Sequence, residues 1–150
     1  DTIFETMAAG DTSFGGINGT LDSASSRLDN GQEFTMEFSR AVEKQIYIDA
    51  DLTVEDTFPG TNAVKDSIID YIGGIYTSGN ESSGFKAGDD VIYGEVEYRI
   101  RDVEGVYDVS NLTIDTADPP SGTSNLLMGR DEVAIANGVD DSITIETTPK

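Results

Sequence analysis

Hydrophobic and polar residues alternate along two neighbouring parts of the chain. In residues 44–54, apolar side chains occupy every second position, and Asp49, Asp51 and Thr53 lie between them. This period of two predicts a strand with one buried and one solvated face. Upstream, Asn30-Gly31 separates two further alternating segments, and both residues tolerate a positive φ, so the pair predicts a β-hairpin. The predicted buried positions of the 44–54 strand are Ile46, Ile48, Ala50, Leu52 and Val54.

After this strand the apolar spacing changes from two to three and four. The turn at residues 58–60, Phe-Pro-Gly, breaks the extended chain, and Thr61 or Asn62 can cap the helix that follows. Gly73-Gly74 is expected to end this helix. Its single apolar stripe consists of Val64, Ile68, Tyr71, Ile72 and Ile75.

A second helical pattern is predicted to begin at Asp89 or Asp90 and to end at Gly105, a residue that readily adopts the left-handed conformation. Residues 106–114 then alternate as a strand, but the alternation slips at Ser110-Asn111, where a β-bulge is expected. The inward residues of the helix are Ile92, Val96, Ile100 and Val103.

The remaining segments give weaker patterns. Residues 2–9 predict a short helix ended by Gly10, and residues 77–88 are rich in Gly and Ser and predict a polar loop. Residues 131–146 contain two short alternating segments. Because Asn137-Gly138 lies between them, they predict a C-terminal β-hairpin or addition to a sheet edge.

Together these elements predict an α+β fold built from small β-sheet modules. Residues 1–42 form an N-terminal helix and β-hairpin region, residues 43–115 a strand-helix-helix-strand module, and residues 116–150 a linker and C-terminal β-hairpin. Since the chain begins at Asp1 rather than Met, we expect it to be the ordered part of a longer protein, and its first region to continue an upstream part.

Charge narrows the possible functions. The chain has 29 acidic and nine basic residues, a formal net charge of −20, so it would repel nucleic acid. A disordered acidic chain is disfavoured because regular apolar patterns separate the acids. Calcium loading has candidate ligands at 49–56, 89–90 and 140–141, but no EF-hand spacing. We favour adaptation to high salt, which screens the repulsion between surface acids.

The chain contains no cysteine and no histidine, which removes disulfides, thiolate nucleophiles, the usual zinc ligands and the general base that works near neutral pH. No apolar run approaches the roughly 18 residues of a membrane span. We therefore expect a protein that is not an enzyme, binds no cofactor or metal and has no membrane span.

The composition of the chain is sufficient to explain its candidate catalytic and modification sites. The pairs Asp49/Asp51 and Asp89/Asp90 are suitable for glycosidase-type acid and base work, but 29 acids produce such neighbours by number alone. Asn-x-Ser/Thr triplets occur at Asn18, Asn80 and Asn111. They imply glycosylation only in an exported protein, and Asn80 lies in the most exposed setting.

The glycine-rich stretches and the tyrosines need separate interpretations. Residues 12–20 and 77–84 match no phosphate-binding motif and are interpreted as loops. The tyrosines could line a ligand pocket or lie at an interface, where the ring is buried and the hydroxyl stays wet. The interface interpretation is favoured for Tyr71, Tyr93, Tyr98 and Tyr107.

Four stretches carry a resemblance to a known family: residues 29–54, 63–72, 88–114 and 131–146. The most specific are the Gly-Asp-Asp-Val-Ile-Tyr helix start and the Val-Ser-Asn-Leu-Thr-Ile strand. Their order resembles the baseplate J-like family, the wedge proteins of contractile phage tails and related injection systems. Ala41 departs from the proline usual after Phe-Ser-Arg, the 77–88 loop is longer than expected, and the family's large N-terminal part is missing.

The resemblance implies a structural wedge component of a tailed virus or injection particle, located in the tail baseplate of an extracellular particle assembled in the host cytoplasm. The partners implied are other copies of the chain and other wedge, tube or sheath-initiating proteins. The 77–88 loop and the C-terminal hairpin are the exposed elements that burial in a core explains least. From these and the tyrosines, the expected interface residues are Asn80, Phe85, Tyr93, Tyr107, Val133 and Ile135.

Two other functions stay open from the residues alone. The first is a carbohydrate- or surface-binding module in which tyrosines and loop acids hold a ligand, with calcium as a helper. The second, less favoured, is a fragment of an acidic glycosidase. Monomeric behaviour with calcium-dependent glycan binding would favour the first, whereas stable multimers with tube and sheath partners would favour the wedge.

Overall fold

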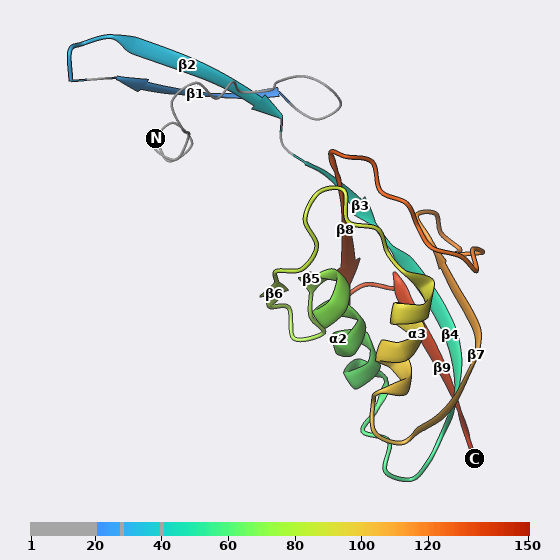
Figure 1. Ribbon diagram of the computed structural model, residues 1–150. Coiled ribbons are helices and arrows are strands. Elements are labelled where there is room, and N and C mark those ends of the chain that lie inside the picture. Colours follow the sequence, from blue (N-terminus) through green and yellow to red (C-terminus); the bar gives the residue numbers. More distant parts are fainter. Residues whose placement is uncertain (1–20, 28, 40) are drawn as a thin grey trace. The chain divides into compact units, whose positions relative to one another are not determined.

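The computed structural model describes residues 21–27, 29–39 and 41–150, so the helix predicted at 2–9 lies outside the described residues. The chain divides into two compact units, one ending at Val42 and one spanning Glu43–Lys150 (Figure 1). Residues 116–150 belong to this second unit, together with 43–115, rather than forming a unit of their own.

The first unit contains the predicted β-hairpin. Strands β1 (Leu21–Arg27) and β2 (Glu33–Ser39) pair in antiparallel orientation over their whole length. In the connection between them Gly31 has a φ of 85°, and the Asn30 side chain accepts a hydrogen bond from the Gln32 amide at 3.0 Å. The Asn-Gly pair therefore forms the turn, as its sequence predicts.

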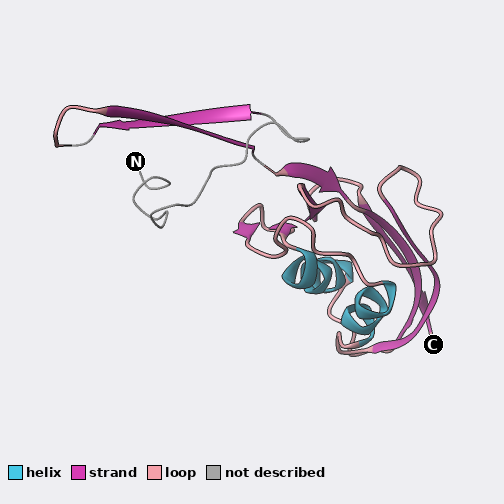
Figure 2. Cartoon of the chain, turned by 45° about the horizontal axis from the view of Figure 1, so that its top comes forward, coloured by secondary structure: helices cyan, strands magenta, loops and turns pink. Residues whose placement is uncertain are grey.

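The second unit contains two sheets and two helices, which confirms the α+β class. The strand orders are β3-β8-β5-β6 in one sheet and β7-β4-β9 in the other. Helix α2 packs against β8 and β9, and α3 packs against α2 and β7 (Figure 2). The elements are β3 (Val42–Gln45), β4 (Tyr47–Val54), α2 (Thr61–Ile72), β5 (Gly74–Ile75), β6 (Glu81–Ser82), α3 (Tyr93–Arg101), β7 (Val106–Asp115), β8 (Glu132–Asn137) and β9 (Ile143–Pro149).

One hydrophobic core lies between the helices and the sheets. Alternate residues of β4 enter it, as do the residues of α2 at helical spacing, so both periodicities predicted from the sequence are confirmed. Its buried hydrophobic residues are Ile46, Ile48, Ala50, Leu52, Val64, Ile68, Ile69, Ile72, Val91, Val96, Ile100, Leu112, Ile114, Ala134, Ala136 and Ile143.

The predicted cap of α2 is wrong, whereas its predicted end is right. Gly60 occupies the N-cap position, and no side chain caps the helix, so neither Thr61 nor Asn62 plays that role. At the other end Gly73, with a φ of 91°, donates its N–H to the Ile69 carbonyl at 2.7 Å. Ile75 lies in β5 rather than on the helical stripe, because the chain turns away from the helix at Gly73.

Helix α3 begins later than predicted. Asp89 and Asp90 do not cap it: the Asp89 carboxylate accepts the Lys86 amide at 2.8 Å, and that of Asp90 accepts the Met128 amide at 2.7 Å. Both acids therefore tie loops together ahead of the helix. Ile92, predicted to face inward, occupies the N-cap position and is 39% exposed.

The predicted β-bulge is present in β7. The register of β4 with β7 shifts between the pairs Asp49–Thr113 and Asp51–Ser110, so that Asn111 and Leu112 both lie opposite Ala50. Asn111 has a φ of 52°, and its side-chain amide donates to the Asp51 carboxylate at 2.7 Å. The slip in alternation therefore marks a real change in backbone conformation.

The two C-terminal strands exist, but the predicted hairpin between them is wrong. β8 pairs with β3 and β5 in one sheet, whereas β9 pairs in parallel with β4 in the other. The Asn137 side chain folds the intervening loop by accepting the Val139 amide and donating to Asp140, both at 2.9 Å. Since β3 continues almost directly into β4, β8 and β9 each find a partner there instead of pairing with one another.

Candidate functional site

The four-stranded sheet has one face toward the helices and one face away from them. On β8, Ala134 and Ala136 are each 1% exposed and belong to the core. Because side chains alternate along a strand, Val133, Ile135 and Asn137 project from the opposite face, and all three are half-buried. Burial in the core does not explain why apolar side chains lie on the face away from the helices.

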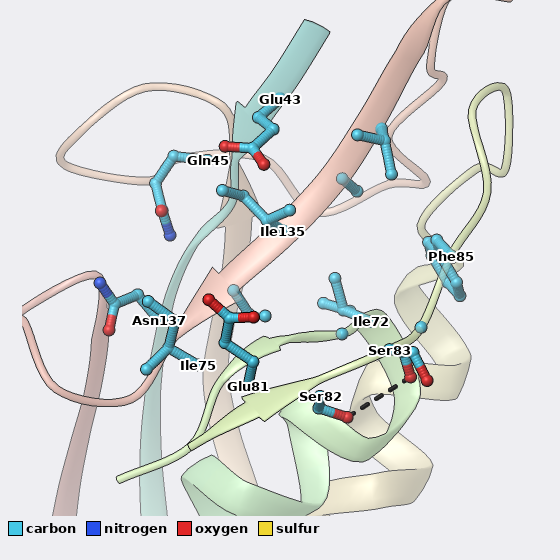
Figure 3. A pocket seen from close by; sticks show the side chains of 16 residues that line it. Glu43, Gln45, Ile72, Ile75, Glu81, Ser82, Ser83, Phe85, Ile135 and Asn137 are labelled. Atoms are coloured by element: carbon cyan, nitrogen blue, oxygen red, sulfur yellow. Dashed lines mark hydrogen bonds between the residues drawn. The ribbon is translucent and has the colours of Figure 1, made fainter. Parts of the chain in front are cut away.

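These residues lie in a groove with a volume of about 460 Å³ (Figure 3). Ile75 is the register partner of Asn137 in β8 and of Glu81 in β6, so all three side chains share one face of the sheet. Glu43 and Gln45 of β3 complete the rim. The groove therefore has an apolar floor and a polar border contributed by four strands.

The groove forms because β5 is short and lies very close to its neighbours. Gly74 has a φ of 135°, and a Cβ there would lie 1.8 Å from the Ala136 carbonyl oxygen. At Gly84 a Cβ would lie 2.3 Å from the carbonyl oxygen of Ile72. Only glycine permits these approaches. After two paired residues β5 ends, which leaves the space between β8 and residues 82–85 open.

Two carboxylates dominate the charge of the groove. Figure 3 shows the Glu43 and Glu81 side chains on the same side of β8 as Ile135. Lys44 is directed elsewhere and pairs with Glu132 at 3.3 Å. Within the described part of the chain, no lysine or arginine nitrogen lies within 4.0 Å of the Glu43 or Glu81 carboxylate. The groove therefore carries negative charge that the described residues do not neutralise.

Three of the six residues expected at an interface meet in this groove: Phe85, Val133 and Ile135. The Phe85 ring packs edge-on against Tyr71, with 4.9 Å between the ring centres, which fixes one wall. Asn80 is exposed in the turn before β6, where its carbonyl accepts the Tyr76 amide at 2.9 Å, and it does not line the groove.

The other two expected interface residues lie elsewhere. The Tyr93 hydroxyl donates to the Leu112 carbonyl at 2.7 Å, which ties α3 to β7, and burial raises the pKa of Tyr93. Tyr107 is 56% exposed, and the Lys150 ammonium lies 3.9 Å from its ring centre. Neither residue contributes to the groove.

The four tyrosines considered for a ligand pocket are not among the residues that line the groove. Tyr71 accepts a hydrogen bond from the Ile92 amide at 3.2 Å, and the Arg99 guanidinium lies 5.6 Å from its ring centre. Burial is the main cause that raises the pKa of Tyr71. Tyr98 is 57% exposed on α3. Their surroundings are those of residues that join elements or meet solvent.

Three of the acids considered for catalysis or calcium serve local structure. Asp51 holds the bulge in β7 through Asn111, and Asp89 and Asp90 accept backbone amides, as described above. Over residues 21–27, 29–39 and 41–150, no three acidic, His or Cys side chains converge as metal ligands would. In the same ranges no helix has the length and apolar character needed to cross a membrane.

Sequence reasoning missed Glu43, Gln45, Ile75 and Glu81 as groove residues. Extending the alternation of the 44–54 strand back by one residue places Glu43 and Gln45 on the polar face, and this signal was available. β5 and β6 have only two residues each, which is too short to show any period.

Comparison with known proteins gives no relative from which to assign this groove. The chain matches none of the protein-family models, and a search of the curated proteins finds no significant match.

Proposed function

We propose that this chain is a structural component of the baseplate wedge in a contractile tail or related injection particle. It acts through protein interfaces that hold a ring around the tail tube. Its partners are other copies of itself and other wedge, tube or sheath-initiating proteins. Two observations support this function: the resemblance found in the sequence, and the structural roles of the residues in the four similar stretches.

One observation carries the proposal. All sixteen buried hydrophobic residues of the described chain lie within the four stretches 29–54, 63–72, 88–114 and 131–146. The resemblance therefore coincides with the framework of the fold. A framework of this kind is what we expect in a protein whose task is to hold a shape for its neighbours.

The polar residues of these stretches support the same interpretation. Asp90 accepts the Met128 amide, Tyr93 donates to the Leu112 carbonyl, and Asn111 donates to Asp51. Each contact joins segments at least 19 residues apart in the sequence. These groups stabilise loops and strand ends, so the described part of the chain uses its most specific motif residues for architecture.

The test is to locate the chain in the native particle. Particles purified at high salt from the source organism would be examined by electron cryo-microscopy, with gold-labelled antibodies against residues 43–150 as an independent marker. The expected result is ring-shaped density around the tail tube that fits the two-sheet unit, with the label at the same end of the tail.

Either of two results would overturn the proposal. One is a label on the capsid or along the whole tail with no density for this unit at the baseplate. The other is a chain that purifies only as a monomer free of particles. In the latter case, calcium-dependent glycan binding would identify the alternative surface-binding module.

A further inference from the structure

We propose that the groove on the four-stranded sheet binds an extended segment of a partner protein that has apolar residues at alternate positions, flanked on the same face by lysine or arginine. The inference rests on the proposed function and names the partner chemistry that one wedge interface would recognise. Its apolar side chains would cover Ile75, Val133 and Ile135, and its cations would lie beside Glu43 and Glu81.

The apolar floor gives the segment something to bury. Val133, Ile135 and Ile75 are half-buried on the face away from the helices, so the core of the chain does not complete their burial. A volume of about 460 Å³ is within the range that holds a ligand of several side chains. Covering such a floor would supply binding energy of roughly 25 cal/mol for each Å² of apolar area removed from water.

The spacing of the floor favours an extended occupant over a helix. Val133 and Ile135 are two residues apart on one strand, a rise of about 6.6 Å. Alternate side chains of an extended partner repeat at the same interval. The Ser82 and Ser83 hydroxyls border the groove and offer polar groups to a partner backbone (Figure 3).

Charge decides the partner's composition. Glu43 and Glu81 have no described lysine or arginine within 4.0 Å, and the whole chain carries a formal charge of −20. A second copy of the chain, with 29 acids and nine basic residues, is therefore a poor occupant. A segment bearing lysine or arginine gains from both carboxylates and from the field of the surrounding acids.

The test measures binding of a fluorescent peptide, Lys-Ser-Val-Ser-Val-Ser-Lys, here called the lysine-valine peptide, to the full 150-residue chain. In the extended conformation its valines and lysines share one face. Fluorescence anisotropy would be recorded at the lowest salt concentration at which circular dichroism shows the chain folded. Replacing both lysines of this peptide with serine removes the charge, and replacing both valines with serine removes the apolar contact. Both control peptides are expected to bind much more weakly.

Two matched variants separate the groove from the general acidity of the chain. Glu43→Gln with Glu81→Gln is expected to weaken binding of the lysine-valine peptide roughly tenfold. Asp56→Asn with Glu104→Gln changes the net charge equally at exposed positions outside the groove and is expected to leave binding nearly unchanged.

A second pair tests the apolar floor. Ile135→Ser is expected to reduce affinity severalfold, whereas Val139→Ser, at a residue that is 64% exposed, is not. Circular dichroism of each variant establishes that it is folded.

The inference is overturned if the lysine-valine peptide does not bind, or if the two double variants weaken binding equally. Failure here with ring density at the baseplate would reject the groove alone. Groove-specific binding without baseplate density would reject the wedge function alone.

Discussion

The bulge in β7 provides a sharp test of how local conformation stabilises the second unit. Asn111 holds a φ of 52°, in the left-handed region that asparagine tolerates better than other residues with a Cβ. Its side-chain amide also donates to the Asp51 carboxylate at 2.7 Å. Replacing it with alanine removes the hydrogen bond and places a less tolerant residue in the same conformation.

The expected magnitude follows from these two effects. Forcing alanine into the left-handed region costs about 1 kcal/mol. Loss of the hydrogen bond costs about 1 kcal/mol, at the lower end for a charged acceptor because both residues lie on a solvent-accessible face. We therefore expect Asn111→Ala to lower the free energy of unfolding by about 2 kcal/mol. Asn111→Gly loses only the hydrogen bond, so its cost is expected to be about 1 kcal/mol.

The measurement is equilibrium unfolding in urea, followed by circular dichroism, with potassium chloride held at one high concentration. Urea is preferred to guanidinium chloride because the latter is itself a salt and would change the screening of the 29 acids during the titration. In a thermal scan each kcal/mol corresponds to a shift of about 4 °C for a unit of this size.

The control is Ser110→Ala, the adjacent residue, whose hydroxyl hydrogen bond to the Asp51 carbonyl is long, at 3.3 Å. Its effect is expected to stay below about 0.5 kcal/mol. Unchanged stability of the alanine variant at 111 would refute the reasoning. Equal losses for the alanine and glycine variants would show that the left-handed conformation contributes nothing.

Three further outcomes are expected. Gly74→Ala should cost about 2 kcal/mol or more in urea unfolding, because its Cβ would clash with the Ala136 carbonyl, whereas Gly79→Ala, with open space around it, should cost about 1 kcal/mol. Glu132→Gln should destabilise the chain near neutral pH. The Gly129 amide and Lys44 hold the pKa of Glu132 below its ordinary value of 4.5, so that stabilisation is present above 4.5 and is lost as the pH falls through the lower folded value. The difference in free energy of unfolding between wild type and variant, measured in urea across this pH range, should therefore shrink on acidification. A constant difference would contradict the stabilisation of the Glu132 carboxylate by Gly129 and Lys44. Finally, the thermal midpoint should fall on dilution from molar to millimolar salt, since the acids then repel one another unscreened; an unchanged midpoint would count against adaptation to high salt.

Features set by neighbouring residues were predictable from the sequence. The Asn30-Gly31 turn, the apolar stripe of α2 and the bulge at Asn111 each depend on conformations or periods that a few consecutive residues determine. The class of the fold follows from the same local patterns, because they distinguish strands from helices.

Features set by pairing between distant segments were not predictable. The alternation at Val133 and Ile135 shows that a strand forms there, but it carries no information about the neighbouring strand. The Asn137-Gly138 pair suggested a hairpin, yet Asn137 uses its side chain to fold a loop between two sheets. Similarly, Phe85 reaches the groove only because residues around 73 and 84 approach without side chains.

The parallel pairing of β4 with β9 determines how the second unit responds to a pulling force. The ladder runs from the pair Ile48 and Ile143 to the pair Val54 and Pro149. A force applied between residues 43 and 150 pulls the two strands in opposite directions along their length, so it loads all the hydrogen bonds of this ladder in shear at once. In the β1–β2 hairpin, by contrast, Leu21 faces Ser39, and a force between these ends separates the hydrogen bonds one after another. The two-sheet unit would therefore keep its structure under tension that unzips the hairpin.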